Sequence, residues 1–187
     1  MNKAILMSIQ PKWVAKILNG EKTIEVRKKF PKDYVGWVYI YCTKDNKEGL
    51  HIVKDKWVCI KHNKVLKECC YNGTVVARFW CDKVEEITPQ LWTPTKEQEI
   101  LKSACLTEND LFNYIGDNSK KPFYAIHISK LEVFDKSKEI GELKSKHYPQ
   151  FANMEKNAIH YELVSIKNAP QNFCYVEDTL WKRLVYY

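Results

Sequence analysis

The sequence predicts an α+β protein, in which a mixed, mostly antiparallel sheet closes into a small barrel with short helices packed at its ends. Segments 37–43, 74–84 and 123–133 are rich in β-branched and aromatic residues, which favours strands. Two short helices are expected at 96–104 and 108–115. The sheet is therefore expected to form the body of the fold.

The first 20 residues predict a strand followed by a short helix. Segment 4–9 is almost entirely apolar, which suits a strand that is covered on both faces. Pro11 suits the first residue of a helix, and Gly20 suits the residue that stops it. The expected helix has an apolar stripe at helical spacing, formed by Trp13, Val14, Ile17 and Leu18.

A second strand is expected over 22–28, where the sequence alternates with period two. Ile24 and Val26 should face one way, and Thr23, Glu25 and Arg27 the other. The strand at 37–43 alternates in the same manner: three aromatic rings, Trp37, Tyr39 and Tyr41, share one face with Thr43.

Capping residues mark the two later helices. Thr95 with Gln98 and Thr107 with Asp110 have the spacing of N-terminal caps, and Gly116 is the expected end of the second helix.

Two regions give weaker signals. Residues 44–72 are polar and rich in lysine, and we interpret them as an insertion, with a hairpin at about 53–60 and 65–69. In the last 40 residues we expect a helix near 151–157 and a short strand near 161–166.

Composition limits the class of protein. The chain has 187 residues, of which 45% are hydrophobic and 13% aromatic, enough to form a core. No apolar run approaches the roughly 20 residues of a membrane span, and no signal peptide is expected. Seven cysteines in a chain of this size favour reduced thiols and a cytoplasmic setting.

The net charge of +7 is unevenly placed along the chain. Residues 1–70 hold 15 basic and 7 acidic residues, and the remainder holds 15 and 16. A basic half beside a nearly neutral half is typical of a surface that binds a polyanion, although a lysine-rich solvated face with no partner remains the alternative.

The opening segments SIQPKWVAKILNGEKTIEVRKKFP and GWVYIYCT resemble the start of ASCH domains, which belong to the PUA-like superfamily of small β-barrels. The motif Gly-x-Lys-x-x-Glu-x-Arg falls on Gly20, Lys22, Glu25 and Arg27. YNGTVVARFWCDKVEEI, LTENDLFNYIG, YAIHISKLEVFDK and PQNFCYVED are similar to a bacterial and phage-associated branch.

The resemblance implies a PUA-like barrel domain over 1–136, with 44–72 as an insertion, and a C-terminal extension over 137–187 that packs on the barrel. It further implies a cleft beside the first helix and a role in binding RNA or a modified base. Some ASCH proteins resemble N4-acetylcytidine amidohydrolases, and others are ribonucleases. Lys22 matches the catalytic lysine of the amidohydrolase group, but Glu25 stands where that group has threonine.

The residues also allow a physical account of ligand binding. Lys22 supplies a point charge for phosphate, or a desolvated amine if the site is dry. Glu25 accepts from exocyclic amines, and Arg27 grips phosphate or a purine edge. The aromatic face of 37–43 offers surfaces for base stacking. The expected ligand-binding residues are Ser8, Lys12, Lys22, Thr23, Glu25, Arg27, Tyr41, Thr43, His127, Ser129 and Gln171.

Each assignment has a structural alternative. Glu25 and Arg27 alone would suit an exposed ion pair, and the aromatic stripe would suit a core face covered by the C-terminal segment. His127 would suit a hydrogen-bonded core histidine. The basic run Arg27, Lys28, Lys29 and Lys32 would suit a solvated face.

No metal or cofactor is expected. Cys59, His62, Cys69, Cys70 and Cys81 are of the right type for zinc, but only Cys59-x-x-His62 has a suitable spacing. Cys42 and Cys174 are considered as nucleophiles, but the segment around Cys174 offers no evident base, which favours a structural thiol.

Three functions follow from this sequence. The favoured one is a module that binds RNA, single-stranded nucleic acid or a modified nucleotide. The alternative is a hydrolase acting on a modified nucleoside, or a ribonuclease, in which Lys22 and Glu25 are the catalytic base and acid. The third is an adaptor whose aromatic face contacts a protein partner.

Overall fold

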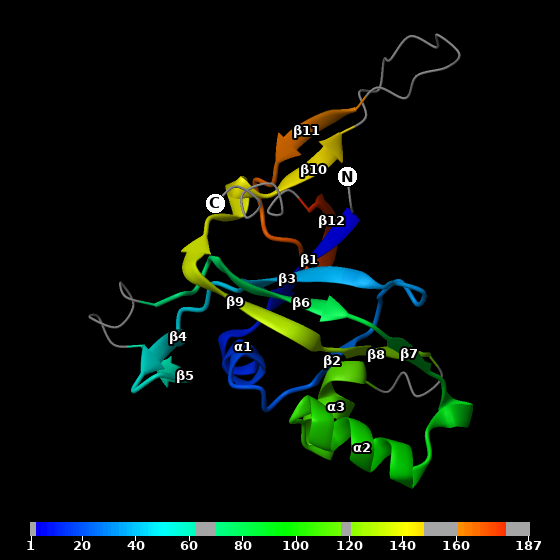
Figure 1. Ribbon diagram of the computed structural model, residues 1–187. Coiled ribbons are helices and arrows are strands. Elements are labelled where there is room, and N and C mark those ends of the chain that lie inside the picture. The colour runs from blue at the N-terminus through cyan, green and yellow to red at the C-terminus, as the bar shows by residue number, and fades with distance from the viewer. Residues whose placement is uncertain (1–2, 63–69, 117–120, 148–160, 179–187) are drawn as a thin grey trace, which may run out of the picture.

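A computed structural model describes residues 3–62, 70–116, 121–147 and 161–178, and its strands form three sheets (Figure 1). The largest has seven strands in the order β11-β10-β12-β1-β3-β6-β9, the second is β2-β8-β7, and the third is the hairpin β4-β5. β1 and β3 are parallel, and the other pairs are antiparallel. The predicted α+β class and mixed sheet are confirmed, but closure into a barrel is not.

The predicted strand–helix–strand unit is present. It comprises β1 (Lys3–Ile9), α1 (Pro11–Leu18) and β2 (Ile24–Arg27), followed by β3 (Gly36–Cys42). Pro11 opens α1, and Gly20 lies just beyond its end with a φ of 74°, a left-handed conformation that glycine adopts without strain. α1 packs against the large sheet through the apolar stripe that its spacing predicted.

Two of the long predicted strands are each divided between two sheets. Segment 74–84 forms β6 (Val75–Cys81) and then β7 (Val84–Ile87), and segment 123–133 forms β8 (Phe123–His127) and then β9 (Ser129–Lys138). In each case the chain leaves one sheet and enters another after a break of one or two residues. Alternation of side chains does not show such a change of sheet, because both halves are strands.

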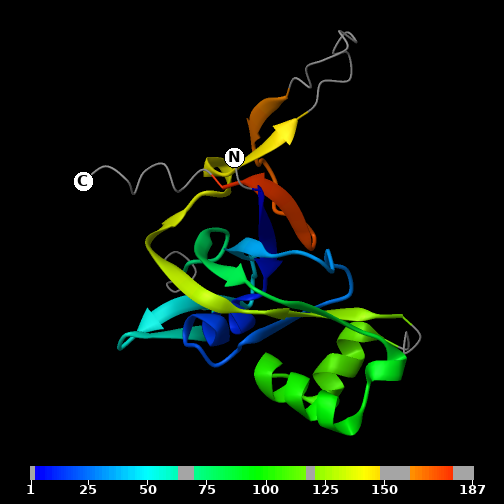
Figure 2. The same cartoon turned by 45° about the vertical axis from the view of Figure 1, so that its right-hand side comes forward.

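The three-stranded sheet is covered by two helices, α2 (Pro94–Ala104) and α3 (Glu108–Ile115), which follow the 3-10 turn η1 (Pro89–Leu91). A core joins them to the sheet, formed by Ile24, Val26, Ile87, Ile100, Ala104, Leu111, Phe123 and Ala125. Figures 1 and 2 show these helices at the opposite end of the molecule from β10 and β11.

The capping predictions are half right. Thr107 and Asp110 form the predicted capping box, and Gly116 follows α3. The predicted cap at Thr95 is wrong: the cap is Thr93, whose hydroxyl accepts from Lys96 N at 3.2 Å. The helix starts two residues earlier than expected because Pro94 occupies its first position, where no backbone N–H is needed.

The predicted hairpin is present but displaced. Its strands are β4 (Glu48–Val53) and β5 (Lys56–Lys61), and the second segment predicted, 65–69, lies outside the described residues. The two turn residues, Lys54 and Asp55, both have positive φ values, 48° and 62°. Two-residue hairpin turns of this kind usually contain Asn-Gly, so the pair Lys-Asp is unusual there. Asn19, after α1, fixes the hairpin by a pair of hydrogen bonds to the backbone of Trp57, at 2.8 and 3.1 Å.

β3 separates two cores. Val38, Ile40 and Cys42 face α1, and the aromatic face of Trp37, Tyr39 and Tyr41 lies in the other. That second core includes Leu143 and Val176, and Phe134, Ile140, Ile166 and Cys174 pack against it. The hypothesis that the aromatic face of β3 stacks bases is therefore wrong, because residues beyond 130 cover it.

The C-terminal part supplies one 3-10 turn and three strands of the large sheet: η2 (Ile140–Glu142), β10 (Lys144–His147), β11 (Glu162–Ser165) and β12 (Phe173–Glu177). β11 confirms the strand expected near 161–166, whereas the helix expected near 151–157 lies outside the described residues. β12 pairs with β1 and brings the loop 170–172 close to the end of that strand. No helix within the described ranges is long and apolar enough to cross a membrane.

Candidate functional site

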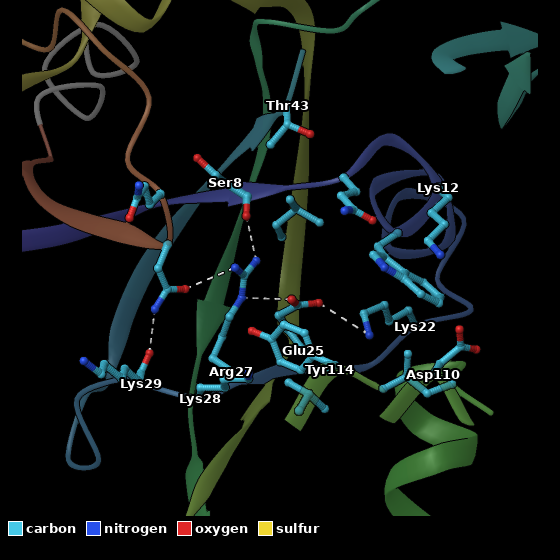
Figure 3. A pocket seen from close by; sticks show the side chains of 17 residues that line it. Ser8, Lys12, Lys22, Glu25, Arg27, Lys28, Lys29, Thr43, Asp110 and Tyr114 are labelled. Atoms are coloured by element: carbon cyan, nitrogen blue, oxygen red, sulfur yellow. Dashed lines mark hydrogen bonds and ion pairs between the residues drawn. The ribbon is translucent and has the colours of Figure 1, made fainter. Parts of the chain in front are cut away.

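A cleft of about 680 Å³ lies between α1, β2, α3 and the loop that precedes β12 (Figure 3). This volume is within the range of small-molecule sites, about 300–1,000 Å³. Its lining combines charged, polar and aromatic side chains from segments far apart in the sequence: Ser8, Ile9, Gln10, Lys12, Trp13, Lys22, Glu25, Val26, Arg27, Lys28, Lys29, Thr43, Leu106, Asp110, Tyr114, Gln171 and Asn172.

The floor of the cleft is a row of three buried charges. The Lys22 Nζ lies 3.4 Å from Glu25 Oε2, and Arg27 Nε lies 3.0 Å from Glu25 Oε1. Their side chains are 2%, 8% and 10% exposed, in chain order. The alternative of an exposed ion pair between Glu25 and Arg27 is therefore wrong. Each carboxylate oxygen faces one cation and retains further lone pairs for a ligand donor.

Lys22 lies between the end of α2 and the cleft. Its ammonium donates to Ala104 O at 2.7 Å, at the carbonyl end of the helix, where a cation is favoured. It also lies 5.2 Å from the centre of the Trp13 ring. Burial lowers the pKa of Lys22 below 10.5, because a charged amine is poorly solvated there, and the nearby Glu25 carboxylate opposes this effect.

Arg27 braces the wall of the cleft. Its Nη2 donates to Ser8 O at 2.7 Å, and its Nη1 donates to Asn172 Oδ1 at 3.1 Å. Asn172 in turn donates to Lys29 O at 2.8 Å. The guanidinium thus links β1, β2 and the C-terminal loop, and its Nε–H, close to Glu25, has no aligned hydrogen bond. Each terminal nitrogen uses one of its two N–H groups in these contacts, so the grip of Arg27 on a phosphate or purine edge stays a prediction that would use the remaining N–H groups.

The rim of the cleft carries exposed lysines and aromatic rings. Lys12 Nζ lies 4.4 Å from the centre of the Trp13 ring, and Lys28 Nζ lies 5.5 Å from the centre of the Tyr114 ring. The carboxylate of Asp110 accepts from Thr107 at the start of α3, and these hydrogen bonds lower its pKa. The rim is therefore predominantly positive, since its acidic member serves a helix cap.

Seven of the predicted ligand-binding residues line this cleft: Ser8, Lys12, Lys22, Glu25, Arg27, Thr43 and Gln171. Ser8 is held in place by its Oγ, which donates to Pro170 O at 2.6 Å.

Four predicted residues do not line it. Thr23 is exposed, and its backbone bridges Ser103 and Ile128. Tyr41 is buried against the C-terminal part and borders a neighbouring hollow.

His127 and Ser129 are held by residues of β6 and β7. His127 Nε2 lies 2.6 Å from Glu85 Oε1, so the hydrogen bond of the structural alternative is present, but the side chain is 26% exposed and does not lie in a core. Ser129 Oγ donates to Trp80 O at 2.9 Å. The alternation of the sequence correctly predicted strands at both residues. The contacts of their side chains depend on the neighbouring strands β7 and β6, which the alternation does not identify.

Sequence reasoning missed the aromatic wall of the cleft. Trp13 was assigned to the apolar stripe of α1, and Tyr114 and Asp110 were not assigned to the site. The four-residue spacing of Asp110 and Tyr114 places them on one face of α3, which is the signal that identifies them. Nothing in the sequence indicates that Asn172 contacts Arg27, because 145 residues separate the two.

The cysteines considered as nucleophiles or metal ligands include several with a raised thiol pKa. Burial raises the pKa of the thiols of Cys42 and Cys174 above the usual value, which disfavours the nucleophilic thiolate. Burial and the neighbouring Glu48 raise the pKa of Cys59 to about 12. No group of three or more His, Cys, Asp or Glu within the described residues is arranged to hold a metal ion, and Cys69 lies outside them.

Comparison with known proteins places this architecture in a class. No protein-family profile matches the chain, and no curated protein is a significant match. Among solved structures, ASCH from Zymomonas mobilis matches with a TM-score of 0.57 and 14% identity, covering 97% of this chain and 93% of that one. A serine-to-alanine and a tyrosine-to-phenylalanine variant of that protein both match with a TM-score of 0.58 at the same identity.

These variants cover 97% and 98% of this chain, and 94% and 97% of their own. The chain is thus a sheet-dominated α+β domain with a charged cleft beside its first helix. More particularly, it has the fold of the ASCH structures from Zymomonas mobilis. The phage-associated branch remains a prediction from the sequence.

Proposed function

We propose that the chain binds single-stranded RNA, or a nucleotide or modified nucleotide, with one base in the cleft. The observation that carries this proposal is the composition of the cleft: two aromatic rings, Trp13 and Tyr114, border a hollow with a buried polar floor and a rim of exposed lysines. Stacking of a base on an aromatic ring is worth roughly 1–3 kcal/mol and suits any base.

The floor and the rim would hold different parts of the ligand. The Glu25 carboxylate, fixed between Lys22 and Arg27, accepts a hydrogen bond from an exocyclic amine or ring N–H of the base. The exposed lysines Lys12 and Lys28 contact phosphate, which gives affinity that depends on salt. The ASCH-like fold supports this assignment by analogy, since PUA-like domains typically bind RNA.

The experiment is a thermal-shift series with nucleosides, modified nucleosides, nucleotides and short RNAs. A ligand that binds only the native state raises its melting temperature by mass action. Tyr114→Ala should weaken binding about 5- to 150-fold, the equivalent of one stacked base. Tyr114 is 41% exposed, so the variant should fold normally. Tyr161→Ala is the matched control, since Tyr161 is 37% exposed and does not line the cleft.

Equal behaviour of Tyr114→Ala and Tyr161→Ala would contradict the placement of the base. If no member of the series stabilises the wild type, the nucleotide-binding proposal is wrong. A protein partner then becomes the better explanation of the basic surface.

A second candidate is a hydrolase acting on an amide of a modified nucleoside such as N4-acetylcytidine, or a ribonuclease. The lowered pKa of Lys22 favours it, because a neutral amine 3.4 Å from Glu25 is able to take a proton from water. In amide hydrolysis Lys22 takes a proton from water as the water oxygen adds to the carbonyl carbon, the C–N bond then breaks, and the same proton passes from Lys22 through the Glu25 carboxylate to the leaving nitrogen.

Mass spectrometry of the same samples separates the two functions. Cytidine and acetate formed from N4-acetylcytidine, with loss of turnover in Lys22→Met, would establish the amidohydrolase. Shortened RNA would indicate the ribonuclease. Ligand stabilisation without any new mass identifies a binding module.

A further inference from the structure

A second hollow, of about 540 Å³, adjoins the cleft. It lies between the ends of β1 and β3, the turn at Gly73, the start of η2 at Glu139 and Ile140, and the loop 167–171 before β12. Ser8, Thr43 and Gln171 line both hollows, so the two adjoin along these residues. Each alone has the volume of a small-ligand site.

The boundary between the two hollows is rigidly held. Ser8 N donates to Asn172 O at 3.1 Å, and Thr43 N donates to Ile9 O at 2.9 Å. With the Ser8 Oγ bond to Pro170, these contacts tie the C-terminal loop to the ends of β1 and β3. A ligand that passes from one hollow to the other would therefore cross a polar edge with a fixed position.

The second hollow is also positively charged. Two exposed lysines line it, Lys44 and Lys167, and no carboxylate of the described residues lies within 4.0 Å of either ammonium. The side chain of Lys44 passes close to Gly73, where a Cβ would lie 3.1 Å from Lys44 Cε. The acidic member of the lining, Glu139, lies at the start of η2, where its backbone N–H donates to the Glu142 carboxylate at 2.9 Å and its carbonyl accepts from Glu142 N at 3.0 Å.

We infer that the ligand is a single strand of at least two linked nucleotides, which runs from the cleft across Ser8 and Thr43 into the second hollow. This inference rests on the proposed function and adds to it a minimum length of the nucleic-acid ligand and the path of that strand over the protein surface. The base in the cleft is stacked, and the phosphate of the adjoining nucleotide lies between Lys44 and Lys167. A repeating polyanion suits two contiguous basic hollows because each holds one unit of the same chemistry.

The test compares a mononucleotide with an RNA and a DNA hexamer on wild type and on Lys44→Ala/Lys167→Ala. The double variant should lose about 10-fold in affinity for a hexamer and keep its affinity for the mononucleotide. The matched control is Lys61→Ala/Lys136→Ala, which removes the same charge from exposed positions outside both hollows. Ala169→Trp provides a second variant, which fills the new hollow without a change of charge.

Several results would overturn the inference. One is that the hexamer binds the wild-type protein no more tightly than the mononucleotide does. That result would contradict the second hollow as a subsite but would leave the cleft as a nucleotide site. Others are equal hexamer affinities of the double variant and its control, or a hexaglutamate peptide that competes as well as RNA. If neither mononucleotide nor hexamer binds the wild type, both this inference and the proposed function fail.

Discussion

Two buried arginines of this protein, Arg27 and Arg78, have similar charged and aromatic neighbours but differ in the open volume beside them. Arg27 faces Glu25 on β2, beside Lys22. Arg78, on β6, lies 2.7 Å from Glu132 and 3.4 Å from Asp178, with its guanidinium carbon 4.1 Å from the centre of the Trp37 ring. Both regions thus combine a buried cation, carboxylates and aromatic rings.

The difference is the space beside the charges. Arg78 is sealed in the second core, where Tyr39 also donates to Asp178 at 2.5 Å, and it lines neither of the two hollows. The row formed by Lys22, Glu25 and Arg27 opens onto 680 Å³ of free volume. Burial of charge therefore does not identify a site by itself, since the open volume next to the charges separates the cleft from a structural ion cluster.

The largest expected effect concerns the sealed cluster. Arg78→Met should lower the free energy of unfolding by about 3–5 kcal/mol, because it leaves the buried Asp178 carboxylate without its cation. Urea denaturation measures this loss. Glu132→Gln is the internal control and should cost less than about 1 kcal/mol, since the Glu132 side chain is 46% exposed.

The distinction between a structural ion cluster and a binding cleft would be wrong if Arg78→Met kept its stability but lost its affinity for nucleotides. That result would make the sealed cluster a binding element. We expect the folded variant to bind like wild type, because Arg78 is not part of the cleft lining.

A smaller effect is expected at the rim of the cleft. Lys12→Ala/Lys28→Ala should weaken RNA binding about 10-fold and reduce the slope of log K against log salt by up to about 2, one for each phosphate contact. Fluorescence anisotropy over a range of salt concentrations measures both quantities. Lys61→Ala/Lys136→Ala is the control and should leave the slope nearly unchanged. An equal change in both double variants would mean that the effect comes from the net charge of the protein and not from the position of the rim lysines.

The smallest effect is a pH dependence at Lys22. The pKa of Lys22 in the folded protein is below 10.5, so between that pKa and 10.5 the unfolded chain binds more protons than the native one. Stability due to this group therefore rises with pH through that window. The free energy of unfolding of the wild type, minus that of Lys22→Met, should therefore increase as pH approaches 10.5. Urea denaturation at each pH measures this difference.

Subtraction of the Lys22→Met curve removes the titration of all shared groups. A difference that falls as pH rises would mean that the Glu25 carboxylate outweighs burial and holds Lys22 charged. That outcome would also argue against Lys22 as the base of a hydrolase.

Local patterns predicted the parts of the fold that depend on neighbours in sequence. Pro11 and Gly20 delimit α1, and the alternation over 22–28 places Ile24 and Val26 in a core, although Val26 also borders the cleft with Glu25 and Arg27. The Gly-x-Lys motif led to the charge row, because all three of its charged members lie within six residues of one another.

Long-range packing decided what the sequence did not predict. Tyr114 reaches the cleft because α3 covers the three-stranded sheet, and Asn172 reaches it because β12 pairs with β1. The aromatic face of β3 has the alternation of an open stacking surface, but Leu143 and Val176 close it. Local alternation shows that a face is apolar, whereas the rest of the chain determines whether that face is open.

The most direct test of the cleft is photo-crosslinking of a short RNA that carries 4-thiouridine, with the adducts mapped by mass spectrometry. We expect adducts in the peptides that contain Trp13 and Tyr114, and competition by unlabelled RNA. Adducts concentrated instead on β9, which covers the second core, such as the peptide with Phe134, would contradict the assignment of the cleft as the nucleotide site.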